Sequence, residues 1–415
     1  MSRDLAVEIR RNPSADYTQL PGPSRRPGPL DLLVSLRRSN GGLYVHAFRP
    51  AERSPRTRAH HAQLDIGEAE LLRRAGRLRG IWRDRLVGYA QVDEHGLPVG
   101  YPFAQAANLA ATPGLAENRM GELVEEGRFV LQKLLAGPGR DLGGFREFLL
   151  GALTEEGPLR ISFDSELHLP WPLLAVDSGA AQPWEDFLGH RHQVEQTGDA
   201  YPRVQAPYPV RDRPVTSLNT DATLESVGRA PEVRKLLEER TQLTVRTESE
   251  RFLEALSRAV LDEDLMYFWC HGQFVENGTA YAQLAVRLSD GRDIDADLVR
   301  RYREPHQDAP EALFQPFVLL NACHTGQSAA AELEHLGRAL VELGATGVLG
   351  PQIEIPQVFA AEYAFAFLDL YLTGELTAGE IARGLARHFA DVYRNPLALT
   401  YSLHCGIDSM LELTS

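Results

Sequence analysis

From Pro214 to the end of the chain, short apolar runs alternate with stretches that have helical spacing. Regular alternation of this kind predicts a parallel sheet with helices on both faces, because parallel strands need a long crossover connection, usually a helix. We therefore predict strands at residues 215–219, 243–246, 265–269, 317–321 and 347–350, and helices at residues 231–240, 249–260, 330–343, 359–371 and 378–393.

Two of these predicted strands lead directly into side chains that can carry out chemistry. The apolar run at residues 265–270 is followed by His271 and Gly272, and the run at residues 317–322 is followed by Cys323. The carboxyl ends of parallel strands lie at one edge of the sheet, where ligands bind. We therefore expect His271 and Cys323 to lie close together at that edge.

A thiol beside an imidazole is the combination that a cysteine protease needs. Cys323 would attack a peptide carbonyl, and His271 would act as general base and then protonate the leaving amine. The backbone N–H groups of Gly272 and Cys323 would stabilise the negatively charged oxygen that forms during the attack.

Two other interpretations of these residues start from the same pattern. His271 and Cys323 can be ordinary strand-end residues, because a lone cysteine in a strand often acts as a small apolar side chain. Alternatively, three adjacent pairs (Cys270-His271, Cys323-His324 and His404-Cys405) contain zinc-ligating residue types. Neighbours on a strand point to opposite faces, which argues against a metal site. We therefore expect no metal and no cofactor.

Composition limits the class of protein and its surroundings. The chain has 415 residues and a net charge of -14, which argues for solubility and against non-specific binding of nucleic acid. Its 3 cysteines indicate a reducing compartment, and no run approaches the length of a membrane span. Lysine occurs only at Lys133 and Lys235, whereas arginine is frequent, a bias that favours a bacterial source. We expect a cytoplasmic protein.

Three regions follow from changes in composition along the chain. Residues 1–29 are predicted to be a flexible lead-in, residues 30–206 an N-terminal non-catalytic region, and residues 207–415 the catalytic region. The N-terminal region is predicted to hold a hairpin around Gly41, and helices at residues 68–78, 120–135 and 145–153. The stretch 178–214 is rich in Gly, Pro and His, and is an exposed candidate for self-cleavage. Nine arginines between Arg53 and Arg85 form either a solvated face or a docking patch for an acidic partner.

The two motifs resemble those of the CHAT family, whose caspase-like domains belong to the clan of separase, gingipain and the caspases. Residues 267–272 and 320–326 look like its catalytic motifs, and residues 165–174, 281–298 and 395–403 look like further family segments. The resemblance implies a caspase-like, mostly parallel α/β sheet flanked by helices and preceded by a related non-catalytic α/β half. It also implies a cysteine endopeptidase with the dyad His271 and Cys323.

The sequence departs from the family pattern in two places. Trp171 is followed by Pro172 where an acid is usual, and the segment 350–356 lacks a frequent tryptophan. Because the latter lines the substrate pocket in relatives, specificity is open. Asp221 and Glu354 are candidate pocket acids that would favour Arg or Lys before the scissile bond. The alternative is that both are solvated loop acids or helix caps, as Asp221 would be before a short helical turn.

The resemblance also implies partners. The expected substrate is a protein, for example a gasdermin-like pore former in bacterial antiviral defence or programmed death, and an activator protein is expected as well. Two alternatives are a catalytically silent scaffold with the same fold and a zymogen that needs a partner. Calcium stimulates some relatives, but the sequence itself does not indicate calcium binding.

Overall fold

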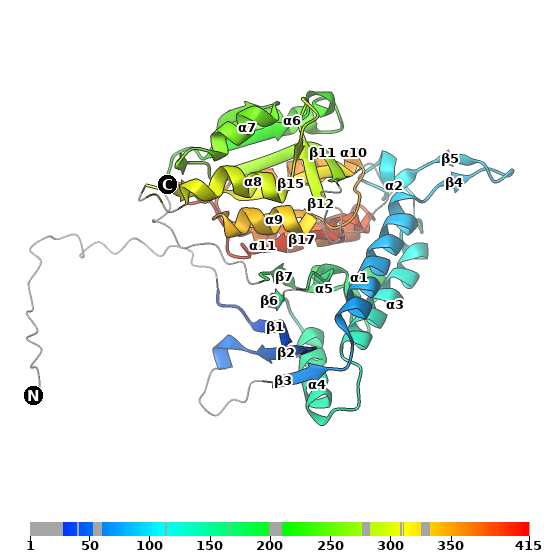
Figure 1. Cartoon of the computed structure of the whole chain (residues 1–415). Helices are drawn as coiled ribbons and strands as arrows, with labels where there is room; N and C mark the ends of the chain where they lie inside the picture. Colours follow the sequence, from blue (N-terminus) through cyan, green and yellow to red (C-terminus); the bar gives the residue numbers. More distant parts are fainter. Residues whose placement is uncertain are drawn as a thin grey trace, which may run out of the picture.

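The computed structural model of the chain is shown in Figure 1. It describes residues 28–414 apart from residues 40, 53–59, 113, 166, 199–209, 276–282, 308, 310 and 325–332. Several predictions therefore fall wholly or partly outside the described residues: the lead-in, the self-cleavage stretch, part of the arginine cluster, and Thr325 and Gly326 of the second motif. No described helix combines the length and the apolar character that crossing a membrane requires.

A mainly parallel sheet forms the centre of the C-terminal part. Its strands are β8 (Val215–Thr220), β9 (Gln242–Arg246), β11 (Leu265–Val275), β12 (Gln283–Arg287), β13 (Asp293–Ile294), β15 (Phe317–His324), β16 (Gly347–Pro351) and β17 (Tyr401–His404). Strands β9, β8, β11, β15 and β16 run parallel to one another, whereas β12 and β13 are antiparallel to their neighbours and β17 is antiparallel to β16. This arrangement confirms the α/β fold expected from the sequence.

Helices cover both faces of this sheet, because its strands are apolar on both sides. One face packs against α6 (Ala230–Arg240), α10 (Gln357–Tyr371) and α11 (Ala378–Asp391). The other packs against α7 (Ser249–Leu256), α8 (Ala296–Arg303) and α9 (Leu333–Glu342). Side chains of β11 alternate between the two cores: Tyr267 and Trp269 belong to the first, and Phe268 and Cys270 belong to the second.

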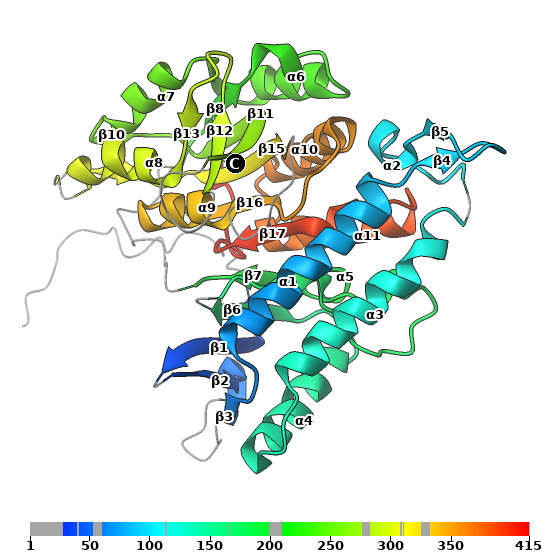
Figure 2. The same ribbon diagram turned by 45° about the vertical axis from the view of Figure 1, so that its right-hand side comes forward.

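The N-terminal part is also built from strands and helices. Its strands are β1 (Leu32–Ser39), β2 (Gly42–Phe48), β3 (His60–Leu64), β6 (Arg160–Ser165) and β7 (Gln193–Gln196), and its long helices are α1 (Glu68–Trp82), α3 (Glu117–Leu134) and α4 (Arg140–Thr154). Strands β1, β6 and β7 are parallel, and the predicted hairpin is formed by β1 and β2. Figure 2 shows α1 and α3 side by side next to this sheet.

Short elements complete the described chain. They are β4 (Gln91–Val92), β5 (Pro98–Gly100), β10 (Val260–Leu261), β14 (Leu313–Phe314), α2 (Pro102–Gln105), α5 (Leu188–Arg191), the π-helix η3 (Arg83–Val87), and the 3-10 helices η2 (Pro50–Glu52), η4 (Trp171–Leu173), η5 (Pro183–Asp186), η6 (Ala222–Leu224), η7 (Glu304–His306) and η8 (Pro396–Thr400). The helix predicted at residues 249–260 ends earlier, because Val260 belongs to β10 and pairs with Leu313.

The two parts share one 13-stranded sheet, because β17 pairs with β7. Leu403 pairs with Glu195, and His404 pairs with Gln196. In Figure 1 this contact lies between the C-terminal layers and the N-terminal strands below them. The sequence did not indicate a strand at either place. The predicted division at residue 206 stays a prediction, but the hydrogen-bonded sheet is continuous across it.

Candidate active site

His271 and Cys323 are paired in register on neighbouring strands. Strand β11 runs parallel to β15, and the pairing proceeds from Leu265 with Phe317 to His271 with Cys323. Neighbouring strands lie about 4.8 Å apart in the hydrogen-bonding direction. The structure therefore brings together the two residues that the sequence predicted to meet.

Both strands extend further than the sequence predicted. Strand β11 ends at Val275 instead of at position 269, and β15 ends at His324 instead of at position 321. The predicted strand ends were wrong because pairing continues past them: β12 pairs antiparallel with β11 from His271 onward, and β15 pairs with β11 as far as His324. His271 thus lies within β11, at the point where the strand that pairs with β11 on one side changes from β8 to β12.

That change of neighbour places Asp221 next to His271. Strand β8 pairs with β11 only as far as Thr220, which lies opposite Trp269. The N–H of Asp221 then donates to the carbonyl of Trp269 over 3.1 Å. Since β8 stops here and the pairing of β11 with β12 starts only at His271, the first residue after β8 lies beside the imidazole.

The Asp221 carboxylate is held firmly and has one oxygen directed at His271. Its Oδ1 accepts from the N–H and from the hydroxyl of Thr223, each over 2.9 Å, so Asp221 caps η6 as the sequence alternative proposed. Its Oδ2 lies 3.6 Å from Nε2 of His271. This separation is longer than a hydrogen bond but within the range of an ion pair to a protonated imidazole.

The closeness of Asp221 to His271 was not predicted from the sequence. The sequence predicts Asp221 as a candidate acid in the wall of the substrate pocket, because it directly follows the strand at Val215. The sequence did hold a hint of it. Asp221 and His271 each follow a predicted parallel strand, and the carboxyl ends of such strands lie at one edge of the sheet. Pattern alone does not give strand order, so the adjacency of β8 and β11 was not available from it.

Gly272 is enclosed on both sides by the sheet. It is buried and lies between Val286 of β12 and His324 of β15. The backbone there is therefore fixed by two ladders, whereas the sequence analysis had placed it after a strand end. The oxyanion role of Gly272 and Cys323 stays a prediction.

Glu354 lies apart from these residues. It follows β16, is half-buried, and makes no hydrogen bond or ion pair with His271 or Asp221 in the described part of the chain. Burial raises the pKa of the Glu354 carboxyl, and the charge of Arg83 opposes this rise. Its role in a substrate pocket stays a prediction.

The cysteines outside the second motif are buried in the cores. Cys270 is 0% exposed in the core beside α7, α8 and α9, and Cys405 is 3% exposed. Burial, reinforced by Glu195 and Asp164, raises the pKa of the Cys405 thiol. Among the described residues, no three His, Cys, Asp or Glu side chains are grouped in a way that would hold a metal ion.

Comparison with known proteins gives a family, a relative and similar structures. The model of the family described as the CHAT domain matches residues 131–398. A probable protease of Vitiosangium sp. (strain GDMCC 1.1324) is 32% identical over 157 residues, which cover 37% of this chain and 19% of that protein. The match therefore spans about a fifth of the relative's length.

Two solved structures have a similar course of the backbone at low sequence identity. The Saccharomyces cerevisiae separase–securin complex has a TM-score of 0.44 and 10% identity, covering 91% of this chain and 30% of that chain. The Arg-specific cysteine proteinase gingipain R has a TM-score of 0.39 and 10% identity, covering 75% of this chain and 80% of that chain.

Proposed function

This chain belongs to the CHAT domain family, and from that premise we propose that it is a cysteine endopeptidase with Cys323 as nucleophile and His271 as general base. The observation that carries the proposal is the register pairing of His271 with Cys323 on parallel strands. The identity of the residue types adds to it, because a thiol and an imidazole are the two groups that the reaction needs.

The proposed reaction has two steps. His271 takes the proton of the Cys323 thiol, and the sulfur attacks the peptide carbonyl carbon. The C–N bond breaks as the imidazolium returns a proton to the amine, which leaves a thioester on Cys323. Water, deprotonated by His271, then attacks the thioester carbonyl; the C–S bond breaks, the new carboxylate leaves, and the imidazolium returns its proton to the Cys323 thiolate.

Asp221 is proposed to position His271 and to stabilise its charged form. Its Oδ2 faces Nε2 of the ring at 3.6 Å, which leaves Nδ1 as the nitrogen for the thiol proton. A fixed negative charge at this distance favours the imidazolium that forms after proton transfer. The two bonds from Thr223 hold the carboxylate in place, so little reorganisation is needed during the reaction.

The preferred substrate is proposed to be a protein with Arg or Lys before the scissile bond. The Asp221 carboxylate already accepts from Thr223 and lies beside His271. Of the two predicted pocket acids, Glu354 is therefore the one more available to bind a substrate cation.

The proposal that the substrate is a gasdermin-like pore former in a bacterial defence pathway, cut in response to an activator, rests on the family resemblance alone. Co-expression with such a protein, followed by mapping of the cut site, tests it.

Selective alkylation tests whether Cys323 is an activated thiol. Cys270 and Cys405 are buried, so we expect iodoacetamide to modify Cys323 at least about 10-fold faster than either of them at neutral pH. Peptide mapping by mass spectrometry gives the rate at each cysteine. The rate at Cys323 should fall in His271→Ala, because that variant lacks the base.

Two outcomes separate the alternatives. Equal and slow labelling of all three cysteines would contradict the enzyme and favour a silent scaffold. Selective labelling of Cys323 without peptide cleavage would instead indicate an enzyme that waits for an activating partner.

A further inference from the structure

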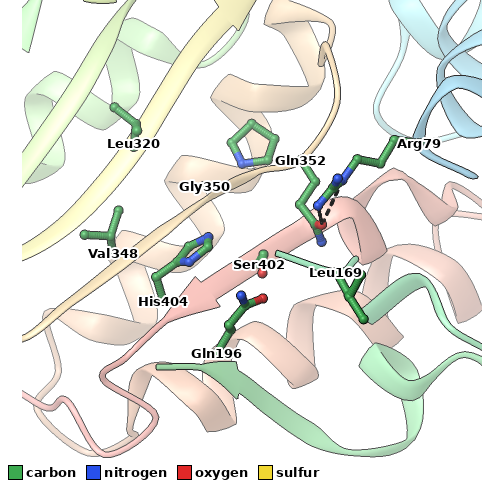
Figure 3. A pocket seen from close by; sticks show the side chains of 10 residues that line it. Arg79, Leu169, Gln196, Leu320, Val348, Gly350, Gln352, Ser402 and His404 are labelled. Carbon is green, nitrogen blue, oxygen red and sulfur yellow. Dashed lines mark hydrogen bonds between the residues drawn. The ribbon is translucent and has the colours of Figure 1, made fainter. Parts of the chain in front are cut away.

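A small polar cavity lies where the N-terminal part meets the C-terminal sheet. Its polar lining comes from Arg79 of α1, Gln196 of β7, Gln352 after β16, and Ser402 and His404 of β17 (Figure 3). The cavity has a volume of about 20 Å³. None of the residues of the candidate active site lines it, so it is a separate feature of the fold.

Arg79 brings a buried positive charge to this cavity, and no carboxylate of the described residues pairs with it. The residue is 5% exposed, and its guanidinium donates to the carbonyl of His168 over 3.0 Å and to Oε1 of Gln352 over 3.4 Å. Burial alone lowers the pKa of Arg79 to about 10, so it remains charged at neutral pH. A buried cation without a counter-charge is strongly destabilising.

Arg303 shows how this chain accommodates a buried guanidinium elsewhere. Its side chain donates to three backbone carbonyls, those of Arg258, Ala259 and Leu313, and lies over the ring of Phe314. Arg79 has one such carbonyl and a long contact to a neutral amide instead. It therefore has fewer backbone carbonyl acceptors than Arg303, and the cavity lies beside it.

The other polar groups of the cavity are neutral, and one of them offers an unused donor. Gln352 is 6% exposed, and its Nε2 has no hydrogen-bond partner. Nε2 of Gln196 is engaged with Nδ1 of His168 at 2.9 Å. Burial, together with the charge of Arg79, lowers the pKa of His404 to about 4, so its imidazole is uncharged at neutral pH. No carboxylate appears among the described residues that line the cavity.

We propose that this cavity binds one small monovalent anion, such as chloride, between the guanidinium of Arg79 and the amide of Gln352. A positive charge and an unpartnered N–H donor that line the same small cavity are complementary to an anion. The size of the cavity selects a small one, because a single water needs roughly 10–15 Å³ and little room is left beyond that. The bound anion would tie α1 to the segment after β16 and thereby hold the two parts of the chain together.

Bromide tests the site directly on the wild-type protein. Crystals grown with bromide in place of chloride, and measured at the bromine absorption edge, should show an anomalous peak in contact with Arg79 and Gln352. A peak there supports the proposal. Water alone at that place, with bromide bound only at surface arginines, would overturn it.

A stability measurement in solution tests the same site independently. We expect the thermal midpoint of the wild type to rise by about 3 °C between chloride-free gluconate buffer and about 0.2 M chloride at constant ionic strength. Gln352→Glu supplies a carboxylate beside Arg79, so its midpoint should no longer depend on chloride. Gln242→Glu, an exchange at an exposed strand residue, should keep the chloride dependence. An equal chloride shift in Gln352→Glu and in the wild type would contradict the proposal.

Discussion

His271→Ala is expected to lower kcat/KM for peptide cleavage by about 10³- to 10⁴-fold, because the variant loses the base that activates the thiol. The thermal midpoint should change little, since the imidazole is 31% exposed and belongs to neither apolar core. Cleavage of a peptide that the wild type cuts, measured alongside thermal unfolding, gives both quantities. Wild-type activity in this variant would exclude His271 as the base.

Asp221→Asn tests whether Asp221 positions His271. Asparagine has the same shape and can still cap η6, but it lacks the negative charge that faces His271. We expect kcat to fall by about 10-fold, with KM nearly unchanged. If Asp221 instead binds a basic substrate side chain, the same variant should raise KM selectively for substrates with Arg or Lys. The split between kcat and KM therefore distinguishes the two roles.

Glu263→Ala is expected to lower the free energy of unfolding by about 3–5 kcal/mol, because it leaves a buried arginine without its partner. Glu263 pairs with Arg246 at 2.5 Å and accepts from the hydroxyl of Ser217 at 2.6 Å. Arg246 also reaches Asn219 of β8, so this network ties β8 and β9 to the segment before β11. Urea unfolding of wild type and variant measures the difference.

A surface pair provides the control for this stability effect. Arg251 and Glu254 are neighbours on α7 at 3.5 Å, with side chains that are 70% and 54% exposed. Glu254→Ala should change the free energy of unfolding by no more than about 0.5 kcal/mol, since solvent screens an exposed pair. Equal losses in Glu254→Ala and Glu263→Ala would contradict the role given to burial.

The sequence predicted the elements and the reacting residues because both are encoded locally. Alternation of apolar runs with helical spacing gave nearly all the long elements of the C-terminal part, and α10 and β16 were placed within two residues at each end. The apolar runs that lead into His271 and Cys323 identified the two strands whose register pairs them.

The features that the sequence did not predict depend on contacts between distant segments. Strand β17 follows a buried 3-10 helix, and β7 lies in a polar stretch, so neither has the pattern of an isolated strand. They become strands by pairing with distant segments: β17 pairs with β16, β7 pairs with β6, and the two pair with each other. The contact of Asp221 with His271 likewise depends on strand order and on the exchange of β8 for β12 along β11.

The central claim is that Cys323 carries out peptide hydrolysis, and the most direct test is cleavage of a positional peptide library by wild type and Cys323→Ala. The library places every residue type before the scissile bond. We predict cleavage by the wild type after Arg or Lys and none by the variant. Cleavage that persists in Cys323→Ala would contradict the claim, and cleavage by the wild type only after apolar residues would remove the proposed basic specificity while leaving the nucleophile in place.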